Sequence, residues 1–280
     1  MHLARLLLLA LSALLASGVA RAADDAGSQR ALIDAALTRF VVEPAPPARV
    51  FFLGFAGFGE ERVFAEEVKL AAQNIAARYG SAARTVLLVN DRRDLTTLPL
   101  ATHDNLRYAL SELGKRMNPE SDVLFLVLSS HGAPNAMIEV SNTGMEPVGL
   151  SPTSVEILTR QAGIRNRVIV VSACFSGAFV EPLANDDTIV LTAASKSRAS
   201  FGCSDERHLT YFGEAFFQDA LPGAGSLREA FEATRGAIRK RERKERVKAS
   251  QPQAHFGAVL EERLAEIETA RRSAPNFPGM

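Results

Sequence analysis

The sequence has no tryptophan and only 3 tyrosines among its 280 residues. Proteins that bind single-stranded nucleic acids stack bases on aromatic rings, so a site of that kind is not expected here. The sequence also lacks an excess of charge, because 32 basic residues balance 32 acidic residues. Such a balance gives no basic surface for a phosphate backbone, and no nucleic-acid partner is expected.

Clusters of metal-binding residue types are also missing. His103, His208 and His255 lie in or near helical segments without Cys, Asp or Glu at the spacing of a metal site. The glycine-rich stretch GFAGFG, at residues 54–59, lacks the G-x-G-x-x-G spacing of a dinucleotide loop. We therefore expect neither a metal nor a cofactor.

Long hydrophobic runs are absent after the N-terminus. Residues 6–16 are rich in Leu and Ala, and Ala20-Arg21-Ala22 has the small residues that a signal peptidase reads. This predicts a cleaved signal peptide at residues 1–22 and a mature chain that starts near Ala23 and is periplasmic or extracellular. No later window reaches the roughly 18 apolar residues of a membrane helix, so stable membrane insertion is not expected.

Two apolar runs organise the remaining chain. DVLFLVLSSHG, residues 122–132, ends in His131 and Gly132, and RVIVVSACFSG, residues 167–177, passes through Cys174. Unbroken runs of this kind are typical of strands buried on both faces of a parallel sheet. Both reactive side chains therefore lie just past a strand, at the carboxyl edge where α/β sheets collect their ligands.

The alternation of strand and helix patterns predicts an α/β fold. A mostly parallel sheet of five or six strands is expected, with a small hairpin between residues 138 and 150. The predicted organisation has an N-terminal helix with a proline-rich linker at 23–48, a main domain at 49–270 and a tail at 271–280.

A thiol and an imidazole in these positions indicate a nucleophilic Cys/His site. Cys174 precedes Phe-Ser-Gly, where the chain must turn and can direct N–H groups toward an oxyanion. Gly132 leaves its own N–H accessible beside His131. The three residues suit acyl transfer, with one nucleophile, one acid/base and an oxyanion site.

These motifs resemble those of the legumain-like C13 cysteine peptidases of clan CD, which share the caspase/legumain fold. His-Gly follows one buried strand, and Ala-Cys-x-Ser-Gly follows another, similar to the family motif E-A-C-E-S-G. The stretch from Thr192 to Glu214 is similar to the family's segment after its fifth strand, and SQPQAHFG at 250–257 echoes a further one.

The resemblance implies a three-layer caspase-like fold and a peptide or protein substrate. Cys174 would attack the scissile carbonyl to form an acyl-enzyme, and His131 would give a proton to the leaving amine. The N–H groups of Gly132 and Cys174 would hold the oxyanion.

By position in the family, Ser172, Ser200 and Glu214 would line the substrate pocket. Ser172 stands where the family motif has Glu, which separates this chain from the family's Asn specificity. Glu214 favours a basic P1 side chain, whereas Arg62 would offset its charge.

Four interpretations follow. The first is an exported cysteine endopeptidase. The second is a transpeptidase or transamidase of the same fold, in which an amine resolves the acyl-enzyme. The third is an inactive caspase-like scaffold that binds partners. The fourth is an exported α/β protein in which Cys174 and Cys203 form a disulfide, as a lone cysteine pair can outside the cytosol.

Overall fold

The computed structural model of the chain describes residues 27–40, 48–142 and 146–273. The predicted signal peptide, most of the proline-rich linker and the end of the tail lie outside these ranges. Within them, no helix combines the length and the hydropathy that crossing a membrane requires.

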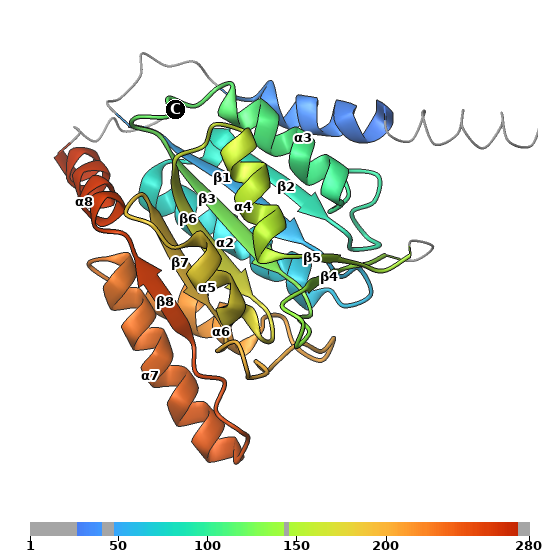
Figure 1. Cartoon of the computed structure of the whole chain (residues 1–280), viewed down its shortest axis with the longest axis vertical. Helices are drawn as coiled ribbons and strands as arrows, with labels where there is room; N and C mark the ends of the chain where they lie inside the picture. Colours follow the sequence, from blue (N-terminus) through green and yellow to red (C-terminus); the bar gives the residue numbers. More distant parts are fainter. Residues whose placement is uncertain (1–26, 41–47, 143–145, 274–280) are drawn as a thin grey trace, which may run out of the picture.

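A six-stranded sheet forms the centre of the molecule, in the order β2-β1-β3-β6-β7-β8 (Figure 1). The first five strands are parallel to their neighbours, and β8 pairs antiparallel with β7 at the edge. The bounds are β1 (Val50–Ala56), β2 (Thr85–Val89), β3 (Val123–Ser129), β6 (Asn166–Ser172), β7 (Thr188–Thr192) and β8 (Gln253–Phe256).

The central strands are buried because helices cover both faces of the sheet. Every residue of β1, β3, β6 and β7 is buried, which explains their unbroken apolar sequences. One face packs against α2 (Val63–Tyr79), α6 (Tyr211–Gly213), η3 (Glu214–Ala220), α7 (Leu227–Glu245) and α8 (Ala258–Ser273). The other packs against residues 27–37, α3 (His103–Gly114), α4 (Pro152–Gln161) and α5 (Val180–Leu183). The predicted three-layer α/β architecture is confirmed (Figure 1).

Local sequence signals place several helix ends. Thr102 caps α3 by accepting from the N–H of Asn105, and Ser151 caps α4 by accepting from Ser154. The predicted hairpin is also present, as β4 (Ile138–Val140) paired with β5 (Val148–Leu150).

The N-terminal helix, residues 27–37, packs into the same core as the sheet. Ile33 and Leu37 are buried on its inner face. Gln29 Oε1 accepts from the N–H of Leu100 at 2.7 Å and from Asn105 Nδ2 at 3.2 Å, which ties the helix to α3. This segment is therefore part of the folded unit.

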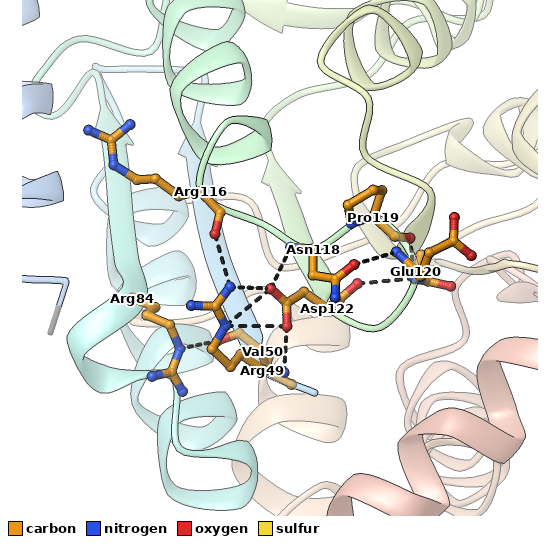
Figure 2. Close-up of polar contacts among 9 residues, drawn as sticks. Arg49, Val50, Arg84, Arg116, Asn118, Pro119, Glu120 and Asp122 are labelled. Atoms are coloured by element: carbon orange, nitrogen blue, oxygen red, sulfur yellow. Dashed lines mark hydrogen bonds and ion pairs between the residues drawn. The ribbon is translucent and has the colours of Figure 1, made fainter. Parts of the chain in front are cut away.

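A polar cluster closes the amino ends of β1 and β3 (Figure 2). The buried carboxylate of Asp122 accepts from the Arg49 guanidinium and from the Arg49 and Asn118 N–H groups. A buried carboxylate with a cation and two amide donors is fully paired, as a structural ion pair needs to be. His131 and Cys174 follow the opposite ends of their strands.

Candidate active site

The loops that carry His131 and Cys174 meet at the carboxyl edge of the sheet. Ser129 and Ser172, the last residues of β3 and β6, are partners in the parallel register, and the Ser130 N–H donates to Ser172 O. A Cβ added to Gly132 would lie 2.0 Å from the carbonyl oxygen of Cys174 and 3.1 Å from its nitrogen. The two loops are thus in main-chain contact, which only glycine permits at position 132.

Aromatic rings and a carboxylate surround the His131 imidazole. The ring centroids of Phe58 and Phe64 lie 4.6 and 5.0 Å from it in edge-to-face orientation. Glu61 Oε2 lies 3.1 Å from His131 Nε2. About a third of the imidazole side chain remains exposed, so it can reach a substrate. The ring is held from several sides, as an acid/base group needs to be.

Glu61 was not among the residues predicted from the sequence. It precedes α2, where the Arg62 N–H donates to Asp205 at 2.9 Å and so joins the start of this helix to the loop at 193–210. The signal in the sequence was an acidic pair, Glu60-Glu61, between the first strand and its helix. Nothing in the sequence indicated which of the two carboxylates faces a histidine that lies far along the chain.

Cys174 lies in the turn after β6 with its side chain half-buried. The following residue, Phe175, has a φ of 57°, a left-handed conformation that is unusual for a bulky residue and marks a tight turn. The N–H of Ser200 donates to Cys174 Sγ at 3.3 Å, and the Ser200 hydroxyl lies 3.6 Å from the sulfur. The Cys174 thiol also donates to Ser200 O at 3.5 Å, so Ser200 contacts the sulfur through both its main chain and its side chain.

The geometry around Gly132 suits an oxyanion donor. Gly132 pairs with Ile138 in an isolated antiparallel bridge whose hydrogen bonds run from Ala133 N to Met137 O and from Glu139 N to His131 O. The Gly132 N–H takes no part in the two hydrogen bonds of this bridge, and a Cβ added to Gly132 would lie 3.1 Å from Cys174 N. The main chains of the two residues expected to supply oxyanion donors are therefore in contact.

The three residues expected to line a pocket occupy different environments. Ser200 contacts the Cys174 sulfur. Ser172 is buried beneath the turn, with its hydroxyl 3.2 Å from that of Thr210. The Glu214 carboxylate accepts from Arg207 and, at 2.8 Å, from Arg241. Because two guanidinium groups already neutralise Glu214, it has little charge to offer a basic P1 side chain.

Both cysteines are free thiols in the structure. Burial, followed by the proximity of Cys174, raises the pKa of the Cys203 thiol to about 12. At neutral pH Cys203 is therefore a protonated, unreactive thiol. In the described part of the chain, no group of three or more His, Cys, Asp or Glu residues is arranged to hold a metal ion.

Comparisons with known proteins bear on the family and on the fold. The model of the Peptidase C13 family matches residues 109–262, more than half of the chain, including His131 and Cys174. The crystal structure of caspase-1 from Spodoptera frugiperda superposes with a TM-score of 0.51 at 10% identity, covering 78% of this chain and 92% of that one. At this identity the likeness shows the fold alone. No curated protein sequence matches the chain.

Proposed function

The chain belongs to the peptidase C13 family and has a caspase-like fold, so it is a cysteine peptidase, and we propose that it is an exported endopeptidase with a Cys174/His131 dyad. The carrying observation is the main-chain contact between Gly132 and Cys174, which brings a thiol, an imidazole and two N–H groups to one edge of the sheet.

In the proposed mechanism, Cys174 attacks the scissile carbonyl as a thiolate. The carbonyl oxygen becomes an oxyanion that accepts from the N–H groups of Gly132 and Cys174. The C–N bond breaks, and the amine leaves with a proton from His131. Water then attacks the thioester and gives a proton to His131; the C–S bond breaks, which releases the carboxylic acid and regenerates the Cys174 thiolate.

Trapping the acyl-enzyme tests this proposal. The mature chain is incubated with an acylating peptide probe, and its intact mass is measured. We expect one adduct, located on Cys174 by peptide mapping, and none in Cys174→Ala. Cys203→Ser is the matched control, because burial raises the pKa of the Cys203 thiol and keeps it protonated, so its loss should not change the yield. An adduct on Cys203, or none in the native chain, contradicts the proposed nucleophile.

We propose that export delivers the peptidase to the periplasm or the extracellular space. The support is the apolar run at 6–16 followed by Ala20-Arg21-Ala22. Expression of the full chain in a bacterial host should give an exported product whose intact mass is that of a chain starting at Ala23. Ala22→Tyr, which places a bulky residue at the cleavage site, should leave an uncleaved chain. A cytosolic product that retains Met1 contradicts export.

A further inference from the structure

Glu67 is a fully buried carboxyl group on α2, with no exposed surface. Its neighbours along the inner face of the helix are apolar, among them Phe64, Val68 and Ala71. A carboxyl group in such surroundings is unfavourable unless it is hydrogen-bonded. Desolvation accordingly raises the pKa of Glu67 above its ordinary value, although hydroxyl groups act in the opposite direction. An apolar side chain at this position would avoid the free energy of desolvating a carboxyl group.

The hydrogen-bond partners of Glu67 are hydroxyl groups at the ends of the strands that carry the site. Ser129 Oγ, at the end of β3, donates to Glu67 Oε1 at 3.0 Å. Ser172 Oγ, at the end of β6, lies 3.2 Å from Thr210 Oγ1, whose hydroxyl donates to the same carboxyl group. Ser129 and Ser172 are partners in the sheet, so the carboxyl group is linked to β3 directly and to β6 through Thr210. His131 and Cys174 follow these serines by two residues each.

A third connection reaches the segment after the 193–210 loop. Thr210 Oγ1 donates to Glu67 Oε2 at 2.5 Å and accepts from the Gly213 N–H at 2.9 Å, which caps α6. Thr210 Oγ1 also lies 3.2 Å from Ser172 Oγ. A Cβ on Gly213 would lie 2.1 Å from Glu67 Oε2, so the backbone of α6 rests directly on the carboxyl group.

Glu67 and its hydroxyl partners differ from the structural ion pair formed by Asp122. Asp122 joins β1 and β3 at the opposite end of the sheet and is paired with the Arg49 guanidinium (Figure 2). Within the described residues, Glu67 accepts hydrogen bonds from side-chain hydroxyl groups, and these lie at the active-site end of the sheet. Glu67 therefore holds neighbouring segments in place through short, directional bonds and without a cation.

We infer that Glu67 is a positioning residue that fixes the distance between the Cys174 and His131 loops by joining Ser129, Ser172 and Thr210. This inference rests on the proposed function for its catalytic meaning, but the placement itself is a property of the folded chain. Loss of the carboxyl group should let the ends of β3 and β6 and the Thr210 turn shift relative to one another. A displacement of about 1 Å in a catalytic group lowers rates by about a hundredfold.

The test combines Glu67→Ala, Glu67→Gln and the adjacent control Glu66→Ala, which lies on the same helix with its side chain half-exposed. Turnover of a peptide substrate is divided by the concentration of thiol titrated with an active-site probe. We expect Glu67→Ala to lower kcat per titrated site at least tenfold with KM nearly unchanged. Glu67→Gln, which keeps an acceptor and the shape, should recover most of the loss. Glu66→Ala should match the native chain.

A merely structural role would lower the melting temperature and the titrated fraction but leave kcat per titrated site intact. That outcome overturns the inference. Equal losses of kcat in Glu66→Ala and Glu67→Ala would overturn it as well.

Alkylation of Cys174 by iodoacetamide at neutral pH provides a readout that needs no peptide cleavage. Because burial raises the pKa of the Cys203 thiol, it stays protonated at neutral pH and the rate there reports Cys174. We expect His131→Ala to slow alkylation in the native background and to have no effect in the Glu67→Ala background. An equal effect in both backgrounds, or none in the native one, overturns the inference. Failure of peptide cleavage alone counts against the proposed function and leaves this comparison intact.

Discussion

At the residue scale, Gly132 is the position where the site tolerates least change. An alanine there would place its Cβ 2.0 Å from Cys174 O, a contact with main chain that has no side-chain rotation to relieve it. We expect Gly132→Ala to reduce kcat/KM at least a hundredfold and to lower the free energy of unfolding by about 1–3 kcal/mol. Peptide hydrolysis and urea unfolding measure the two effects.

Gly236→Ala is the matched control for this substitution. It lies in α7, where nothing approaches within 4 Å of an added Cβ. Its activity should be native and its stability unchanged or higher by up to about 1 kcal/mol. Native activity in Gly132→Ala would contradict the close contact between the two loops.

The carboxylate beside His131 gives a second prediction at this scale. Glu61 Oε2 lies 3.1 Å from His131 Nε2 on the side of α2, at a distance that suits an ion pair but without the alignment of a hydrogen bond. We expect Glu61→Gln to lower kcat by roughly tenfold, less than the 10²–10⁴ of general acid/base catalysis as a whole, because Glu61 acts through His131. Glu60→Gln is the control, since Glu60 is half-exposed and pairs with Arg92. Steady-state kinetics that show equal activity in both variants would remove Glu61 from the site.

The sequence indicated some site residues and missed others for a physical reason. His131, Gly132 and Cys174 follow buried strands, so their meeting at one sheet edge could be predicted from local patterns; their catalytic roles stay predictions. Glu61 and Glu67 act on residues far away in the chain, through the packing of α2 on the sheet. The clue for Glu67 was an acidic residue on an otherwise apolar helix face, but its hydroxyl partners emerge only in three dimensions.

At the scale of elements, the N-terminal helix gives a prediction about stability. Ile33 is fully buried against the sheet. We expect Ile33→Ala to lower the free energy of unfolding by about 2–4 kcal/mol without changing kcat per titrated site. Arg39→Ala, at an exposed position of the same segment, should change stability by less than about 0.5 kcal/mol. Equal urea midpoints for the two variants would show that the helix is not part of the folded unit.

The edge strand β8 is an element that sequence patterns did not predict. Its four residues, Gln253–Phe256, are half-buried or exposed, so they show neither a buried run nor a clear alternation. The strand forms because β7 offers a free edge, with which it pairs from Ile189 to Thr192. By contrast, β3 and β6 were recognisable because burial on both faces demands apolar residues at every position.

At the scale of the whole molecule, the buried Glu67 makes stability depend on pH. Its pKa in the folded state is raised by desolvation above 4.5. The folded protein therefore holds this proton more strongly than the unfolded chain. The stabilisation that protonated Glu67 provides is complete at pH values below the pKa of Glu67 in the unfolded chain. It is lost as the pH rises through the pKa of Glu67 in the folded protein.

We expect the free energy of unfolding of the native chain, minus that of Glu67→Gln, to fall as pH rises above 4.5. Urea unfolding at a series of pH values measures this difference. The subtraction removes contributions from other titrating groups that both chains share. A difference that stays constant or increases with pH contradicts the assignment of a raised pKa.

The two ends of the sheet carry polar groups with different roles: a structural ion pair at one end and the candidate active site at the other. At the amino ends, Asp122 and Arg49 close the fold with a complete ion pair. At the carboxyl ends, the polar groups lie beneath or beside a half-buried thiol and a partly exposed imidazole. The overall α/β architecture was predictable from strand and helix periodicity, and the family match and the caspase-like fold agree with it.

The most direct test of the account is cleavage of a peptide library with a randomised P1 residue by the reduced mature protein, beside Cys174→Ala. The account predicts cleavage after a restricted set of P1 residues, lost in the variant, with the new C-terminus free when water resolves the acyl-enzyme. Transfer to an added amine in place of hydrolysis would indicate a transpeptidase. Cleavage that persists in Cys174→Ala, or none by either protein, would contradict the proposed Cys174 peptidase.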